Sequence, residues 1–165
     1  MAISKVDIFL KLEGIDGETE DSKHKNEIEI QSFSWGVTNG GTFAAGGGGG
    51  SKHANFQDVS FTKLLDKASP KLFLASATGD HIKTGQFTFR KAGKTEGQQE
   101  YFKVKVSDLL ISSYQVSDHA GADLPAEQVS INFAKIEIEY KEQKADGTLL
   151  GAVNAGYDLK AAKKI

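Results

Sequence analysis

The chain has 165 residues, no cysteine and a formal net charge of −2, from 20 basic and 22 acidic side chains. This length suits one core, so we expect residues 1–165 to form a single domain. The balanced charge argues against nucleic acid or a membrane surface as a partner, and the lack of cysteine excludes disulfides, thiol nucleophiles and zinc–thiolate sites. The apolar runs are too short for a membrane span, and no cleaved signal peptide is predicted.

Alternating apolar and polar residues predict strands along most of the chain. Residues 6–13 alternate strongly, whereas residues 27–35 begin with isoleucines and then change phase before Phe33. The same change of phase recurs within residues 102–111 and 129–140. A phase change inside a strand requires a bulge or a sharp bend. Three such strands therefore predict a strongly coiled sheet that closes into a barrel.

A glycine-rich segment, residues 39–55, separates two of the predicted strands. It reads NGGTFAAGGGGGSKHAN and has almost no apolar side chain to bury. Because glycine loses much backbone freedom on ordering, we expect an extended loop that is either a disordered tether or ordered by something outside the domain. A phosphate-binding loop is disfavoured, since Ser51 and Lys52 stand in the reverse of the Walker order.

One helix is predicted at residues 70–78. Ser69 suits the N-cap, Pro70 the first helical position and Gly79 the C-terminal end. Its residues are apolar on nearly all sides, which is typical of a helix that is buried on more than one side. Since a barrel offers one packing surface, the second contact is expected to come from another subunit.

The remaining segments are shorter. Residues 87–91 are predicted to form a strand, and Asp146-Gly147 marks a hairpin turn before the last segment, residues 155–159. The basic tail, residues 160–165, is expected to be flexible.

The motifs of catalysis and metal binding are missing from the sequence. No Gly-x-Ser-x-Gly elbow occurs, and the histidines are far apart without a metal-binding spacing, so we interpret them as solvated. These histidines are His24, His53, His81 and His119. Glutamates that alternate with isoleucines are typical of the wet face of a strand, although a dispersed carboxylate pair stays open. We predict no cofactor and no metal.

Several short blocks follow one another in order along nearly the whole chain. They are 7–11 (DIFLK), 27–36 (EIEIQSFSWG), 46–50 (GGGGG), 57–63 (QDVSFTK), 66–79 (DKASPKLFLASATG), 90–93 (RKAG), 112–114 (SSY), 132–136 (NFAKI) and 143–147 (QKADG). Together they resemble the Hcp family, the haemolysin-coregulated proteins of bacterial type VI secretion systems. One departure is Ser76, where many relatives carry cysteine.

The resemblance implies a mainly β fold: a small β-barrel of two sheets with one flanking α-helix and an extended glycine-rich loop. It also implies six-membered rings with an open centre, stacked into a tube that a contractile sheath drives outward behind a spike protein. Effector proteins would travel in the lumen. The chain is then a structural tube subunit and not an enzyme. It would lie in the bacterial cytoplasm before firing and be secreted afterwards.

Two sets of candidate residues follow from this resemblance. Ser34 lies in the Ser-Trp-Gly element that lines the family's inner wall, so it is the candidate for effector contact. Subunit contacts are expected in the glycine-rich loop and on the helix, at Phe43, Gly46, Gly47, Gly48, Gly49, Gly50, Lys52, His53, Lys71 and Phe73.

Two alternatives remain open. The first is a small barrel hydrolase with a dispersed carboxylate site, which a pocket with strongly perturbed ionisable groups would favour. The second is a monomeric ligand-binding barrel, in which the backbone of residues 39–55 would be mobile at every protein concentration.

Overall fold

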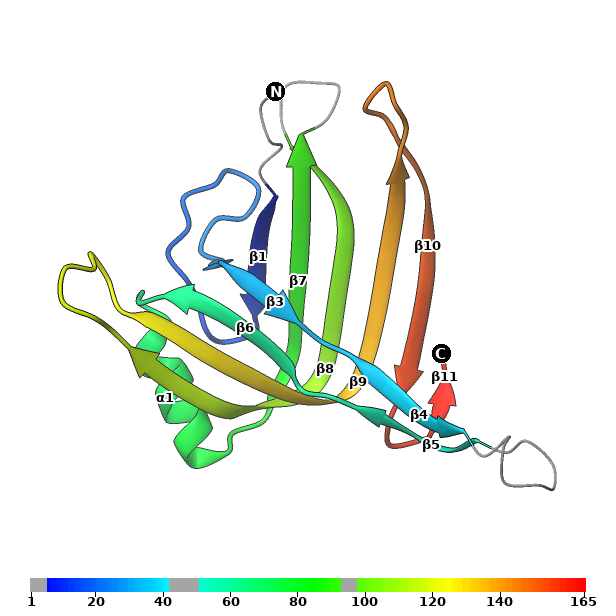
Figure 1. Ribbon diagram of the computed structural model, residues 1–165, viewed down its shortest axis with the longest axis horizontal. Helices are drawn as coiled ribbons and strands as arrows, with labels where there is room; N and C mark the ends of the chain where they lie inside the picture. Colours follow the sequence, from blue (N-terminus) through cyan, green and yellow to red (C-terminus); the bar gives the residue numbers. More distant parts are fainter. Residues whose placement is uncertain (1–5, 42–50, 93–97) are drawn as a thin grey trace.

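The structure is a computed structural model that describes residues 6–41, 51–92 and 98–165. Within these ranges the chain forms one helix and eleven strands, which confirms the mainly β class (Figure 1). The elements are β1 (Asp7–Leu12), β2 (Ile28–Ile30), β3 (Ser32–Ser34), β4 (Val37–Gly41), β5 (Ser51–Phe56), β6 (Val59–Leu64), α1 (Ser69–Thr78), β7 (Ile82–Ala92), β8 (Gln98–Ser117), β9 (Ala126–Gln143), β10 (Leu149–Asp158) and β11 (Lys163–Lys164).

Most strands belong to one antiparallel sheet that bends into two layers. The main order is β11-β10-β9-β8-β7-β1-β2, and β6 pairs with both β9 and β3. Strand β9 serves both layers, because residues 126–131 pair with β6 and residues 135–143 pair with β10. Figure 1 shows the layer of β1, β7 and β10 standing upright, with β3 and β6 crossing it obliquely.

The predicted phase changes in the two longest strands are confirmed, and both occur at the same level. Val106 is buried opposite Ile136, and Leu109 is buried opposite Phe133. Between these pairs, Asp108 takes a left-handed backbone conformation with φ 49°. The hairpin of β8 and β9 therefore bends here as a unit, so that both halves keep their apolar side chains toward the core.

The third phase change, before Phe33, is a break between two short strands. Strand β2 pairs with β1, whereas β3 pairs with β6, so the chain crosses from one layer to the other at Gln31. The backbone N–H of Gln31 donates to the Thr62 carbonyl oxygen at 2.8 Å. Closure of the whole sheet into a continuous barrel stays a prediction.

The core lies between the two layers and beneath the helix. Its largest fully buried apolar side chains come from seven different elements. They are Phe61, Phe87, Leu10, Ile28, Leu72, Leu109, Ile111, Ile131, Val59 and Val104. Such close-packed apolar burial is the main stabilising contribution to the fold.

Helix α1 begins one residue earlier than the sequence predicted. The N-cap is Ala68, which makes no side-chain cap, and Ser69 is turned inward and buried. The prediction that Ser69 caps the helix was therefore wrong, whereas Pro70 does lie in the first turn. Gly79 ends the helix with φ 68°, as predicted. In the part of the chain that the structure describes, no helix has the length and apolarity needed to cross a membrane.

Strands β4 and β5 form a two-stranded ribbon that projects from the body (Figure 1). The predicted loop at residues 39–55 is thus regular at both ends, with Asn39 opposite Ala54. Phe56 fixes the base of the ribbon by stacking on Tyr157, with ring centroids 5.1 Å apart.

The tail that we expected to be flexible forms a turn and the short strand β11. Lys164 pairs with Tyr157 of β10, and the Ile165 N–H donates to the Gly156 carbonyl oxygen at 3.1 Å. The Ile165 side chain lies over Gly156, because a Cβ added at Gly156 would be 2.9 Å from Ile165 Cγ1.

Candidate functional site

The outer face of the oblique layer is lined by small, uncharged polar side chains. Its strands lie in the order β3, β6, β9, β8, and residues directly opposite one another form rows across them. One row is Ser34, Ser60, Ser130 and Ser113, and the next is Ser32, Thr62, Gln128 and Gln115. The residues between them, such as Phe61 and Val129, point into the core. We call this surface the hydroxyl face.

Neighbouring hydroxyl groups on this face bond to each other. The Ser32 and Thr62 hydroxyl oxygens are 2.5 Å apart, and those of Ser60 and Ser130 are 3.0 Å apart. Because each hydroxyl both donates and accepts, these pairs leave capacity for water. The two rows of the hydroxyl face are therefore hydrated and contain no charged or large apolar side chain. Asp58, which accepts hydrogen bonds from Ser112 and Asn132, borders them.

The structure places Ser34 on the hydroxyl face, where it is exposed opposite Ser60. The sequence analysis missed its neighbours Ser60, Thr62 and Ser130. Their alternation with buried residues was visible in the sequence, but the order of the strands that brings them together was not.

Both side edges of the oblique layer are open along their backbones. In the described ranges, β3 pairs with β6 alone, and β8 beyond Leu109 pairs with β9 alone. Neither residues 32–34 nor residues 111–117 contain a charged residue or proline. Natural edge strands usually carry such residues to prevent pairing with another chain. These two edges instead favour pairing.

Helix α1 has an exposed apolar side next to one of these edges. Phe73 and Leu74 are each 57% exposed, and the Phe73 ring lies 6.3 Å from that of Tyr114 in β8. The candidate Lys71 is also exposed. The helix thus packs on its own domain through one side and leaves an apolar side uncovered.

The other candidate contact residues belong to the glycine-rich segment. Lys52 and His53 lie in β5, on the projecting ribbon. Phe43 and Gly46, Gly47, Gly48, Gly49 and Gly50 lie outside the described residues.

Comparison with known proteins decides the family. Residues 9–140 match the family model described as type VI secretion system effector, Hcp. The chain is 39% identical over 156 residues to protein hcp1 of Pseudomonas aeruginosa, covering 94% of this chain and 96% of that protein. The chain belongs to the Hcp family.

Solved structures agree with this assignment. A structure titled as a type six secretion system protein superposes with a TM-score of 0.91 at 30% identity, covering 98% of this chain and 100% of that one. Hcp1 from Salmonella typhimurium has a TM-score of 0.77 at 35% identity, covering 97% and 99%. The resemblance seen in the sequence is thus confirmed, and this Hcp protein is a tube subunit of a type VI secretion system. The family is a secreted, structural one and is not known for enzymatic activity.

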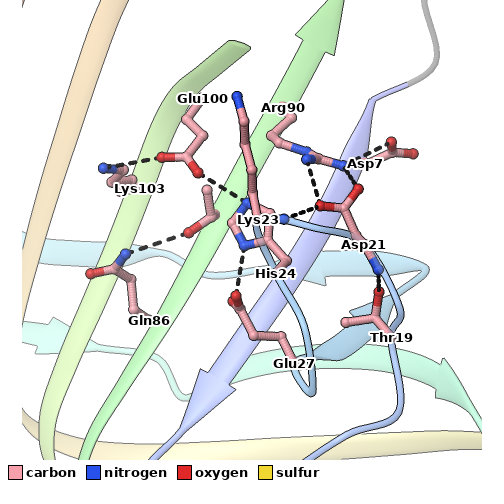
Figure 2. Close-up of polar contacts among 11 residues, drawn as sticks. Asp7, Thr19, Asp21, Lys23, His24, Glu27, Gln86, Arg90, Glu100 and Lys103 are labelled. Carbon is pink, nitrogen blue, oxygen red and sulfur yellow. Dashed lines mark hydrogen bonds and ion pairs between the residues drawn. The ribbon is translucent and has the colours of Figure 1, made fainter. Parts of the chain in front are cut away.

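A polar cluster in this Hcp protein fastens the loop between β1 and β2 onto the upright layer (Figure 2). The buried His24 ring has Nδ1 2.7 Å from Glu27 Oε2 and Nε2 2.9 Å from Glu100 Oε1. It also stacks on Phe9, with centroids 4.5 Å apart. Each ring nitrogen therefore faces a carboxylate oxygen within ion-pair distance. The interpretation of His24 as solvated was therefore wrong.

Arg90 makes the second fastening of the same loop (Figure 2). Its Nη1 and Nη2 donate to the two carboxylate oxygens of Asp21 at 3.1 and 2.8 Å, and Asp7 lies 3.7 Å away. The guanidinium carbon lies 4.6 Å from the centre of the Phe9 ring. The Arg90 hydrogen bond is the main cause that lowers the pKa of Asp21 to about 2.

A third polar cluster, which is fully buried, joins the helix to β6 and β9. Lys63 Nζ lies 2.7 Å from Glu127 Oε1 and donates to Ser69 Oγ at 3.2 Å. Ser69 in turn donates to Glu127 at 2.5 Å. Burial first, and then the interaction with Glu127, raise the pKa of the adjacent Tyr114 to about 12.

Of these polar clusters, this one most resembles a catalytic site of the hydrolase alternative, because serine and lysine serve as nucleophile and base in some hydrolases. Here the lysine is paired with a carboxylate, and Ser69 is sealed from solvent with its proton committed to Glu127. The arrangement fits a structural fastening of α1. Within the described ranges, no group of three or more acidic or histidine side chains is placed to hold a metal ion.

Proposed function

We propose that this Hcp protein closes into rings of six subunits that stack into the inner tube, with the hydroxyl face toward the lumen. The observation that carries this proposal is the pair of open, uncharged edges on either side of the oblique layer. Residues 111–117 of β8 on one subunit pair with β3 of the next, so each subunit offers two different edges. Contacts of this head-to-tail kind close by rotation into a ring.

Ring closure explains why these edges need no protection. Joined edge to edge, the oblique layers form one continuous wall in which no strand edge is left unpaired. The rows that contain Ser32 and Ser34 then continue around that wall. A hydrated wall whose rows of hydroxyl and amide groups carry no charge lets folded cargo move along it without strong adhesion.

The partners follow from the same proposal. Effector proteins travel in the lumen and contact Ser34, while the spike protein caps the tube and the contractile sheath surrounds it. The tube assembles in the bacterial cytoplasm and is driven out of the cell on firing. The glycine-rich segment, with Phe43, residues 46–50, Lys52 and His53, reaches an adjacent subunit or ring. The subunit acts through these contacts and catalyses no reaction.

Two adjacent proline variants test the strand pairing. Successive N–H groups of a strand point to opposite sides, so Gln115→Pro and Val116→Pro remove one N–H at the open edge and one that faces β9. The variant that removes the outward N–H should keep its unfolding temperature and lose rings in negative-stain images and native mass spectra. The other variant should unfold at a lower temperature. A parent protein that is monomeric at every concentration contradicts the ring itself.

A further inference from the structure

The apolar core of the upright layer continues beyond the part that the rest of the domain covers. One row of facing residues runs across β7, β8, β9 and β10, namely Phe89, Phe102, Tyr140 and Val153. Exposure rises along it, from 8% at Phe89 to 45% at Tyr140 and 71% at Val153. The row therefore leaves the core while keeping its apolar character.

Strand β10 is likewise exposed but uncharged along most of its length. Residues 150–155 are all exposed, yet residues 149–157 contain no charged side chain. Among the described residues, β11 and Ile165 cover the outer edge of β10 from Gly156 to Asp158 and leave residues 149–155 open. A long edge strand without charges or proline pairs readily with another chain unless something covers it.

The opposite face of the same layer has ordinary solvent-facing chemistry. There, Lys103 lies directly opposite Glu139, which in turn faces Asn154 of β10. The exposed apolar side chains Tyr140 and Val153 thus lie on one face of the layer, and the charged pair Lys103 and Glu139 lies on the other.

Within the part of the chain that the structure describes, the domain leaves Tyr140 and Val153 of this face uncovered. Phe56 of the ribbon stacks on Tyr157, at the far end of β10 from Val153. Helix α1, which carries the exposed residues Phe73 and Leu74, lies at the opposite end of the molecule from the upper part of β10 (Figure 1). One copy cannot bring these two surfaces together, but two copies in head-to-tail contact can.

Charge favours the same pairing of surfaces. Lys71 is exposed on α1, one turn before Leu74. Glu142 is exposed on β9, two residues after Tyr140 and hence on the same side of the strand. The apolar side of the helix thus has a cation beside it, and the apolar face of the strands has an anion beside it.

We propose that α1 of one subunit packs against the apolar face of β9 and β10 on the next subunit. Phe73 and Leu74 cover Tyr140 and Val153, and Lys71 pairs with Glu142 in this contact. The inference rests on the proposed ring, since it adds an outer contact to the edge pairing of β3 and β8. Each subunit gives its helix to one neighbour and receives a helix from the other.

The absence of cysteine makes disulfide cross-linking a clean test. In the full-length double variant Leu74→Cys with Val153→Cys, mild oxidation should link subunits into a ladder that ends at the closed ring on non-reducing gels. Either single variant should give no disulfide-linked dimer, because a head-to-tail contact never places two copies of one residue together. The control double variant is Leu74→Cys with Val6→Cys. Val6 is 44% exposed and lies outside the proposed contact, so this variant should give no ladder.

Charge exchange supplies a second, independent readout. Lys71→Glu and Glu142→Lys should each weaken the ring, so that the concentration below which rings dissociate rises by about two- to fivefold per contact. The variant that carries both exchanges should return to the dissociation concentration of the parent.

The outcomes separate the two proposals. The helix contact is overturned, and the ring is kept, if native mass spectra show rings but the Leu74→Cys, Val153→Cys variant gives no ladder. The same conclusion follows if its ladder is no stronger than that of the control. A disulfide-linked dimer in either single variant indicates a symmetric contact and also overturns the helix contact. Monomers alone, in the unmodified protein, overturn both.

Discussion

The Asp21–Arg90 pair gives the most quantitative prediction. Asp21→Asn keeps the shape of the side chain but removes the charge that faces the buried guanidinium of Arg90. We expect this variant to be less stable than the parent at pH 7 by about 1 to 2 kcal/mol, and to equal it near pH 2.

The magnitude follows from the pKa of Asp21, which falls from 3.8 to about 2 in the folded protein. At 1.36 kcal/mol per pKa unit, this difference corresponds to about 2.4 kcal/mol. The side chain is 29% exposed, so solvent screens part of the interaction and the lower range is appropriate. Because the folded pKa is depressed, the contribution is complete above the unfolded pKa near 4 and disappears as the pH falls toward 2.

Urea unfolding of both proteins at intervals between pH 2 and pH 7 measures this difference. Asp80→Asn is the matched control, since Asp80 is exposed and makes none of these contacts, and it should stay within about 0.5 kcal/mol throughout. Two results would refute the reasoning: a loss for Asp21→Asn that is as large at pH 2 as at pH 7, or no loss at pH 7.

Three further predictions concern the buried cluster, the lumen and the loop. Lys63→Met should lower the free energy of unfolding, measured in urea, by about 3 to 5 kcal/mol because it leaves the Glu127 carboxylate buried without its cation. The double variant Lys63→Met with Glu127→Gln should recover part of that loss, and equal stability of the single and double variants contradicts the prediction. Ser34→Arg should reduce effector co-purification while native mass spectra still show rings, and unchanged retention removes Ser34 from the cargo surface; Thr78→Arg, on the helix, is the control. Deletion of residues 46–50 should shorten tubes in negative-stain images more than it lowers the unfolding temperature, so normal tubes would contradict the assigned role of the loop.

Local patterns in the sequence predicted the elements whose determinants are local. The phase changes near Val106 and Ile136 follow from side-chain alternation, and Gly79 ends the helix through its own backbone freedom. The prediction for Ser69 was wrong because a tertiary partner, Glu127, competes successfully for its hydroxyl group. That partner is 58 residues away, beyond the reach of any capping pattern.

The polar clusters and the hydroxyl face depend on strand order, which the sequence did not reveal. The burial of His24 needs Glu100, which comes from a distant strand. Likewise, Ser60 and Ser130 are separated by 70 residues and meet because β6 lies beside β9. Side-chain alternation in the sequence predicts which face of its strand a residue occupies, but not which residues of other strands lie beside it on that face.

The path of β9 has a mechanical consequence. Its first half belongs to the oblique layer and its second half to the upright layer, so one backbone runs through both. In the proposed tube, axial load on the inner wall therefore passes to the outer layer along covalent peptide bonds. Strand β8 also runs through both layers, so the layers cannot shear past each other unless both strands break their ladders.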